Sequence, residues 1–111
     1  MSLAEMIYRK TEKFPSYEKF GLTSQMRKCA VAIASNIAEG AGRNSTGQFL
    51  YFLEVAMGSC NELITQLDLS VRFNYLSEEE SEAMIHECCQ IYKMISVLHR
   101  NLSARKTTTS S

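Results

Sequence analysis

The stretch that decides the fold is residues 21–40, GLTSQMRKCAVAIASNIAEG. Its large apolar residues recur at spacings of three and four, which places them on one face of a helix. They are Leu22, Met26, Cys29, Ile33 and Ile37. Small residues line the edge of that face and allow close approach of a neighbouring helix: Ala30, Ala34 and Ala38. The stretch therefore predicts a packed helix over residues 22–39, which Gly40, Ala41 and Gly42 end.

A shorter helix is predicted before this stretch. It covers about residues 2–13 and carries apolar side chains on one side. Pro15 ends it, because the residue before a proline is pushed out of the helical region. Residues 16–20 are predicted to form a short turn that leads into the second helix.

A third helix is predicted from Ser45 to about Phe73. Ser45 with Gln48 three residues later is typical of a capping box at a helix start. The helix carries a heptad-like apolar seam, made of Leu53, Ala56, Cys60, Leu63, Leu67 and Ser70. A second apolar stripe beside it, made of Leu50, Met57 and Ile64, indicates that this helix contacts more than one neighbour.

A fourth helix is predicted after the turn Asn74-Tyr75-Leu76. Ser77 with Glu80 forms a second capping box, and the helix runs to about Leu102. Its predicted core stripe is Met84, Cys88, Ile91, Ile95, Leu98 and Leu102. Four helices with short connections predict an all-α, antiparallel up-down-up-down bundle as one domain over residues 1–102. Residues 103–111 have no apolar period and are predicted to be a flexible tail.

The composition excludes several classes of protein. The chain has 111 residues and 45% hydrophobic content, which suits one globular domain. It has no apolar run long enough to span a membrane and no signal-peptide pattern, so we expect a cytoplasmic protein. Its four cysteines form no CxxC pair, and no Glu-x-x-His motif occurs. We expect buried reduced thiols, no metal, no cofactor and no enzymatic activity.

Charge is unevenly distributed along this chain of zero net charge. Residues 1–43 contain seven basic and four acidic residues, residues 44–87 contain one and eight, and residues 88–111 contain four and none. The densest basic group consists of Arg9, Lys10, Lys13, Arg27 and Lys28. These side chains form either a solvated surface or a phosphate-binding face, and the sequence leaves both open.

One polar group stands at the end of the second predicted helix. Asn36 and Glu39 share a helical face, and Arg43 follows four residues after Glu39. In one reading, Arg43 contacts nucleic acid or a protein partner. In the other, which we favour, Arg43 pairs with Glu39 and Asn36 bonds to neighbouring backbone, so that the group secures the helix end.

Several of these residues together resemble a known family. They are Phe14-Pro15, Glu18, Gly21-Leu22, Gln25-Met26-Arg27, Ser35-Asn36-Ile37-Ala38-Glu39-Gly40, Arg43, Phe52-Leu53, Ala56, Gly58-Ser59 and Glu62-Leu63. The chain is similar, over about residues 6–102, to the four-helix-bundle proteins encoded in intervening sequences of bacterial 23S rRNA genes. The resemblance implies a left-handed bundle and a ring-like homopentamer. It also implies structural roles for Asn36, Glu39, Gly40, Arg43, Gly58 and Ser59.

Two functions follow as expectations. The resemblance also implies distant kinship with accessory proteins of diversity-generating retroelements, which bind a reverse transcriptase and nucleic acid. We therefore expect a homo-oligomeric module that binds RNA, DNA or a nucleic-acid-processing protein. The alternative is a structural or protein-interaction ring with no nucleic-acid role, which zero net charge and the acidic middle third favour.

Overall fold

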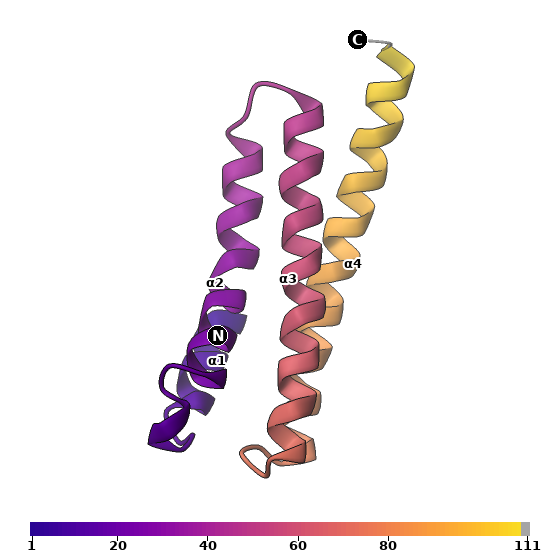
Figure 1. Cartoon of the computed structure of the whole chain (residues 1–111). Coiled ribbons are helices and arrows are strands. Elements are labelled where there is room, and N and C mark those ends of the chain that lie inside the picture. Colours follow the sequence, from indigo (N-terminus) through magenta and orange to yellow (C-terminus); the bar gives the residue numbers. More distant parts are fainter. Residues whose placement is uncertain (110–111) are drawn as a thin grey trace.

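The computed structural model describes residues 1–109, with side chains to residue 105. Within that range it contains helices and no strand: α1 (Leu3–Thr11), the 3₁₀ turn η1 (Ser16–Glu18), α2 (Leu22–Ala41), α3 (Thr46–Arg72) and α4 (Glu78–Thr109). The helices alternate in direction and form an elongated antiparallel bundle of 52 × 24 × 22 Å (Figure 1). The predicted all-α four-helix bundle is confirmed.

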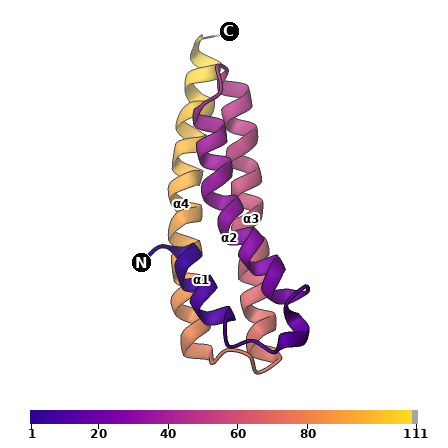
Figure 2. The same ribbon diagram turned by 90° about the vertical axis from the view of Figure 1, so that its left-hand side faces the viewer.

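The helices are not equal members of the bundle. α3 lies between α2 and α4 and packs on both (Figure 1), whereas α1 lies against α2 and α4 (Figure 2). α1 has nine residues and α4 has thirty-two. α1 reaches along only the half of the bundle that contains the α3–α4 turn. The other half is therefore built from three helices.

The seam predicted on the third helix forms the centre of the core. All six of its residues, from Leu53 to Ser70, have no exposed surface. Met26, Cys29 and Ile33 of α2 are buried against it, as predicted, while Leu22 and Ile37 are partly buried. The close-packed edge predicted from the alanines is limited to Ala30, because Ala34 and Ala38 are exposed.

The stripe predicted on the fourth helix is only partly buried. Met84, Cys88, Ile95 and Leu102 are buried and Ile91 packs partly against the core, but Leu98 is 37% exposed. The prediction of a central core position for Leu98 was therefore wrong. The physical reason is the shortness of α1, which leaves most of α4 without a second neighbour.

Helix ends depart from the predictions in two places. The second helix does not stop at Gly40 but runs to Ala41, with Gly42 as its C-cap. α4 continues to Thr109, seven residues beyond the predicted end at Leu102. Part of the predicted C-terminal tail is therefore helical, and residues 110–111 lie outside the described residues.

The predicted caps are largely confirmed. Ser77 and Glu80 form the reciprocal capping box of α4: Glu80 N–H donates to Ser77 Oγ, and Ser77 N–H donates to Glu80 Oε1, both at 3.0 Å. Ser45 Oγ accepts from Gln48 N–H at 3.1 Å, which is one half of the box predicted there. In the turn between α3 and α4, Asn74 adopts a φ of 64°, a left-handed conformation that asparagine tolerates better than most residues.

Candidate functional site

Five of the six predicted binding cations lie at the same end of the molecule. Arg9, Lys10 and Lys13 lie on or next to α1, and Arg27 and Lys28 lie on the first turns of α2, which packs against α1. Arg43 follows the opposite end of α2, at the connection to α3. The structure therefore assembles one basic region from α1 and α2 and excludes Arg43 from it.

Arg27 fastens the two helices of this region together. Its Nε donates to Thr11 Oγ1 at 2.9 Å, and its Nη2 donates to the Tyr8 carbonyl oxygen at 3.3 Å. Its guanidinium carbon lies 4.5 Å from the centre of the Tyr8 ring, within the range of a cation–π contact. Arg27 thus contributes a positive charge that is held in place.

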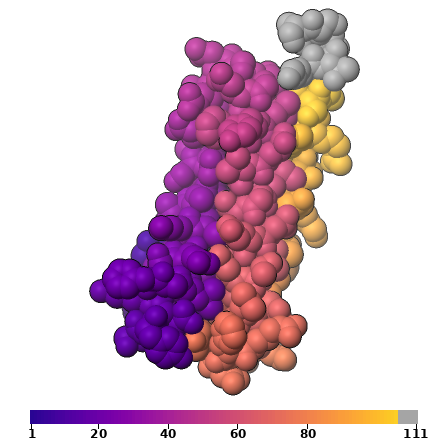
Figure 3. Space-filling view, in the orientation of Figure 1, coloured from indigo at the N-terminus to yellow at the C-terminus, as the bar shows by residue number. Residues whose placement is uncertain are grey.

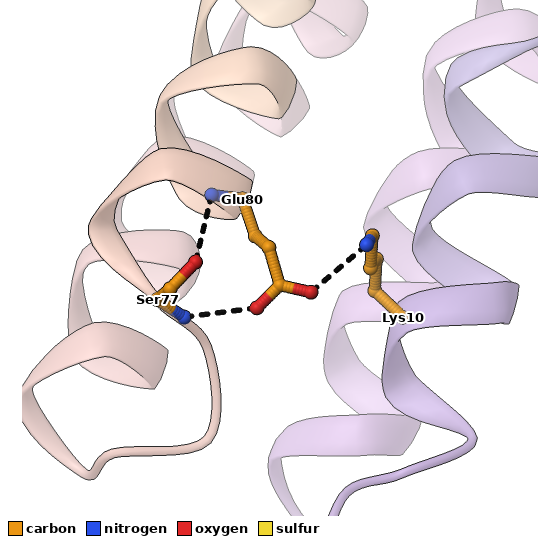
Figure 4. A network of polar contacts seen from close by, with 3 residues as sticks. All are labelled: Lys10, Ser77 and Glu80. Carbon is orange, nitrogen blue, oxygen red and sulfur yellow. Dashed lines mark hydrogen bonds and ion pairs between the residues drawn. The ribbon is translucent and has the colours of Figure 1, made fainter.

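Lys10 also has a structural partner. Its Nζ donates to Glu80 Oε2 at 2.8 Å, which ties α1 to the first turn of α4 (Figure 4). The bond from Lys10 and the bonds from Ser77 lower the pKa of Glu80 from 4.5 to about 2. Glu80 therefore caps α4 and holds α1 at once, and the charge of Lys10 is compensated.

The remaining cations of the region are solvent-exposed: Arg9, Lys13 and Lys28, joined by Lys19, which follows η1. No ion pair involves these four side chains in the described part of the chain. We call this group of four the basic end. Two of the nearby acidic side chains, Glu5 and Glu18, accept hydrogen bonds from other groups. The basic end therefore consists of four exposed cations that are in no ion pair in the described range, with Glu12 as an exposed carboxylate beside Lys13.

A groove of about 620 Å³ runs beside the basic end, between α1 and α2. Its wall includes Tyr8, Lys19, Phe20, Arg27, Lys28 and Val31. Phe20 is 88% exposed and Lys19 Nζ lies 5.6 Å from the centre of its ring. We call this feature the Phe20 groove. In Figure 3 the surrounding surface is the indigo and purple part at the lower end of the molecule.

Lys19 and Phe20 are not among the candidate binding residues identified from the sequence, because only a short turn is predicted over residues 16–20. A signal was present in the sequence: a phenylalanine beside a lysine in a short polar link between two helices, where no apolar periodicity explains it. Glu18 fixes this link. Its Oε1 accepts from Leu22 N–H at 3.1 Å and its Oε2 accepts from the Tyr75 hydroxyl at 2.8 Å. Phe20 is therefore presented by a well-anchored backbone.

The polar group at the far end of α2 has the geometry of the structural reading. Arg43 Nη2 donates to Glu39 Oε1, and the Arg43 guanidinium carbon lies 5.0 Å from the centre of the Phe52 ring. Asn36 Nδ2 donates to the Ala32 carbonyl oxygen at 2.8 Å, so its backbone partner belongs to its own helix. The contact of Arg43 with the Phe52 ring joins the end of α2 to the start of α3.

Gly40 and Gly58 differ in how much space lies beside each of them. A Cβ built on Gly40 would lie 2.9 Å from Phe52 Cβ and 2.8 Å from Phe49 Cδ1, so glycine here allows α2 and α3 to approach closely. A Cβ built on Gly58 would meet nothing within 4 Å. Ser59 beside it is half-buried. Among the described residues, no contact requires glycine at position 58.

The cysteines have the character of buried thiols. Cys29, Cys60 and Cys88 are buried, and Cys89 is half-buried. Burial is the main cause that raises the pKa of Cys29 and of Cys88 to about 12, and that of Cys60 to about 11. Cys29 also donates its thiol hydrogen bond to Glu62 Oε2 at 2.9 Å. A thiol with a raised pKa is a poor nucleophile at neutral pH.

In the described range, no cluster of three or more histidine, cysteine, aspartate or glutamate side chains has the arrangement to hold a metal ion. None of its helices combines the length and the apolar character needed to cross a bilayer.

These features define an all-α antiparallel bundle with a basic end, and the comparisons with known proteins identify its family. The chain belongs to the 23S rRNA-intervening sequence protein family, whose pattern it matches over residues 1–97. It is also similar in fold to a crystal structure of a protein with unknown function from the S23 ribosomal protein family of Bacteroides thetaiotaomicron. The identity is 23% and the TM-score is 0.78, with 87% of this chain and 91% of that chain covered. No curated protein matches the sequence.

The predicted family is thereby confirmed. The kinship with accessory proteins of diversity-generating retroelements stays a prediction, as do the pentameric state and nucleic-acid binding.

Proposed function

We propose that the protein is a non-enzymatic, homo-oligomeric module that binds RNA or DNA through its basic end. The observation that carries this proposal is the clustering of four exposed cations without an ion pair at one end of the described bundle. Lys10, Arg43 and Arg72 are in ion pairs with carboxylates, whereas no ion pair involves Arg9, Lys13, Lys19 or Lys28 among the described residues. Unpaired cations in one region attract a phosphate backbone and release its counterions on binding.

Self-association is the second part of the proposal. Exposed apolar side chains lie on α4, with Met94 65%, Val97 46% and Leu98 37% exposed, in addition to Tyr51 on α3 and Val31 on α2. Ala34 and Ala38 present a small-residue edge on α2 that is exposed in the described part of the chain. We expect copies of the chain to meet through α2 and α3, with the apolar strip of α4 adding to the buried surface. Light scattering after size-exclusion chromatography should give several times the mass of one chain, and a monomer at micromolar concentration would refute this part.

Binding is tested with a fluorescently labelled, structured ribosomal RNA fragment. Anisotropy titrations at several salt concentrations should show an affinity that falls as salt rises, because each phosphate contact adds about 0.7 to 0.9 to the logarithmic slope. Replacing either Lys19 or Lys28 singly with alanine should weaken binding and lower that slope. The matched control is Lys93→Ala on α4, which removes the same charge outside the basic end. Absence of binding at low salt, or equal weakening by the control, would refute the proposal.

A specific observation favours a second candidate, a protein-interaction module without a nucleic-acid role. Residues 44–87 carry eight acidic residues against one basic residue, and they form α3 and the first turns of α4. Such a surface repels nucleic acid and suits a basic protein partner. A pull-down that recovers a protein and no nucleic acid, together with failure of the RNA titration, would favour this candidate.

A further inference from the structure

We infer that the Phe20 groove is a binding site for single-stranded nucleic acid, in which a base stacks on Phe20 and the adjoining phosphates meet Lys19 and Lys28. This inference rests on the proposed function and adds the form of nucleic acid and the residues that select it. Duplex is excluded by the geometry of stacking, because its bases are already stacked on one another and do not present a free face.

The first argument is the exposure of Phe20. An aromatic ring that is 88% exposed gains nothing from the core of this chain, yet its backbone is fixed rather than loose. Gly21 N–H donates to the Glu18 carbonyl oxygen at 3.0 Å, and Lys19 N–H donates to that of Ser16 at 3.1 Å. An aromatic ring that is exposed to solvent on a fixed backbone is suited to serve as a stacking platform for unpaired bases.

The second argument is the charge of the groove. Three of its lining residues, Lys19, Arg27 and Lys28, are cations, and none of its lining residues has a carboxylate. Arg27 is anchored by Tyr8 and Thr11, so its charge stays in the wall. Lys19 lies 5.6 Å from the centre of the Phe20 ring, which puts a cation beside any base stacked there. An anionic chain with aromatic units matches both properties.

The third argument is size and polarity. A volume of about 620 Å³ lies within the range of sites that take small organic ligands, about 300–1,000 Å³. The wall also includes Thr23 and Ser24, whose side chains carry hydroxyl groups. Hydroxyls can donate to and accept from base edges without selecting one base. The groove therefore fits one or two nucleotides of a single strand with little sequence preference.

The test uses the absence of tryptophan from the chain. In the variant Phe20→Trp, the new side chain is the sole tryptophan fluorophore and reports stacking directly by quenching. The full-length variant is titrated with a mixed-sequence single-stranded oligonucleotide, with the same sequence as a duplex, and with a poly-glutamate peptide. Phe20→Ala is measured in parallel by anisotropy, with Phe73→Ala as the matched control, because Phe73 is also an exposed phenylalanine but follows α3 and does not line the groove.

The expected result is quenching of the Phe20→Trp variant by the single strand and little by the duplex. Phe20→Ala should weaken single-strand binding by about fivefold to a hundredfold, the range that base–aromatic stacking provides, while Phe73→Ala changes it little. Thermal unfolding of Phe20→Ala should match the wild type, since the ring packs on no core residue.

Four results would overturn the inference. Equal binding of duplex and single strand with no loss in Phe20→Ala would show a phosphate-only site and leave the proposed function standing. Tighter binding of the peptide than of the oligonucleotide would identify an acidic protein segment as the occupant. A smaller oligomer in Phe20→Ala would show that the ring contacts a second copy of the chain. Failure of every nucleic acid to bind would remove the proposed function as well.

Discussion

Gly40 and Gly58 offer a matched test of how closely α2 and α3 pack. Both are helical glycines, and each is replaced with alanine, so the chemical change is the same. In a helix this replacement gains about 1 kcal/mol in intrinsic propensity. At Gly58 nothing lies within 4 Å of the new methyl group, so we expect the unfolding free energy to rise by about 0.5–1 kcal/mol.

At Gly40 the same gain meets a steric cost. The new Cβ would lie 2.9 Å from Phe52 Cβ and 2.8 Å from Phe49 Cδ1. The Phe49 ring can rotate, but Phe52 Cβ is bonded to the backbone of α3, so relief requires the two helices to separate. Overpacking of this kind costs about 1–3 kcal/mol, which exceeds the gain and leaves a net loss of about 1 kcal/mol. The two variants should therefore differ by nearly 2 kcal/mol.

The assay is thermal and urea unfolding followed by circular dichroism, at several protein concentrations so that any oligomer is accounted for. A difference of 2 kcal/mol corresponds to about 8 °C in melting temperature for a domain of this size. A Gly40→Ala protein as stable as Gly58→Ala would refute the close-approach argument. A destabilised Gly58→Ala whose loss depends on protein concentration would show that a second copy fills the space beside that residue.

Three further predictions concern single side chains. At protein concentrations low enough to separate the copies, Ile95→Ala should cost about 2–5 kcal/mol in urea unfolding and Leu98→Ala clearly less, because Ile95 is 3% and Leu98 is 37% exposed in the single chain. Equal losses at the lowest protein concentration would contradict this difference in burial, whereas a Leu98→Ala loss that grows with protein concentration would place Leu98 in the contact between copies. Arg43→Ala should lower the unfolding free energy by less than about 1 kcal/mol, since its ion pair is solvent-exposed, and should leave RNA affinity unchanged. Weaker RNA binding with an unchanged melting temperature would show that Arg43 contacts RNA instead of securing the helix end. The pKa of Glu80 is lowered from 4.5 to about 2 in the folded protein, so its contribution to the unfolding free energy is complete above about pH 4.5 and is lost as the pH falls toward 2. When the unfolding free energy is measured against pH in this range, its slope should be flatter in Glu80→Gln than in the wild type. Identical slopes would contradict the role of Lys10 and Ser77.

Much of the fold follows from local pattern in the sequence. Leu53, Ala56, Cys60, Leu63, Leu67 and Ser70 are all completely buried, as the heptad-like spacing predicted. The capping box of Ser77 and Glu80 and the pair of Glu39 and Arg43 were also predicted correctly. Each depends on residues three or four positions apart in one helix or at its end, so helical geometry alone brings the partners together.

Tertiary structure decided what depends on the relative lengths and positions of helices. The exposure of Leu98 follows from the length of α1, which spacing along α4 does not contain. The need for glycine at position 40 follows from its distance to Phe52 on another helix, although the sequence indicated a helix stop. Likewise, only the packing of α1 on α2 brings Tyr8, Arg27 and Phe20 to one groove. A local pattern determines which face a side chain occupies, but contact between helices decides whether that face is covered.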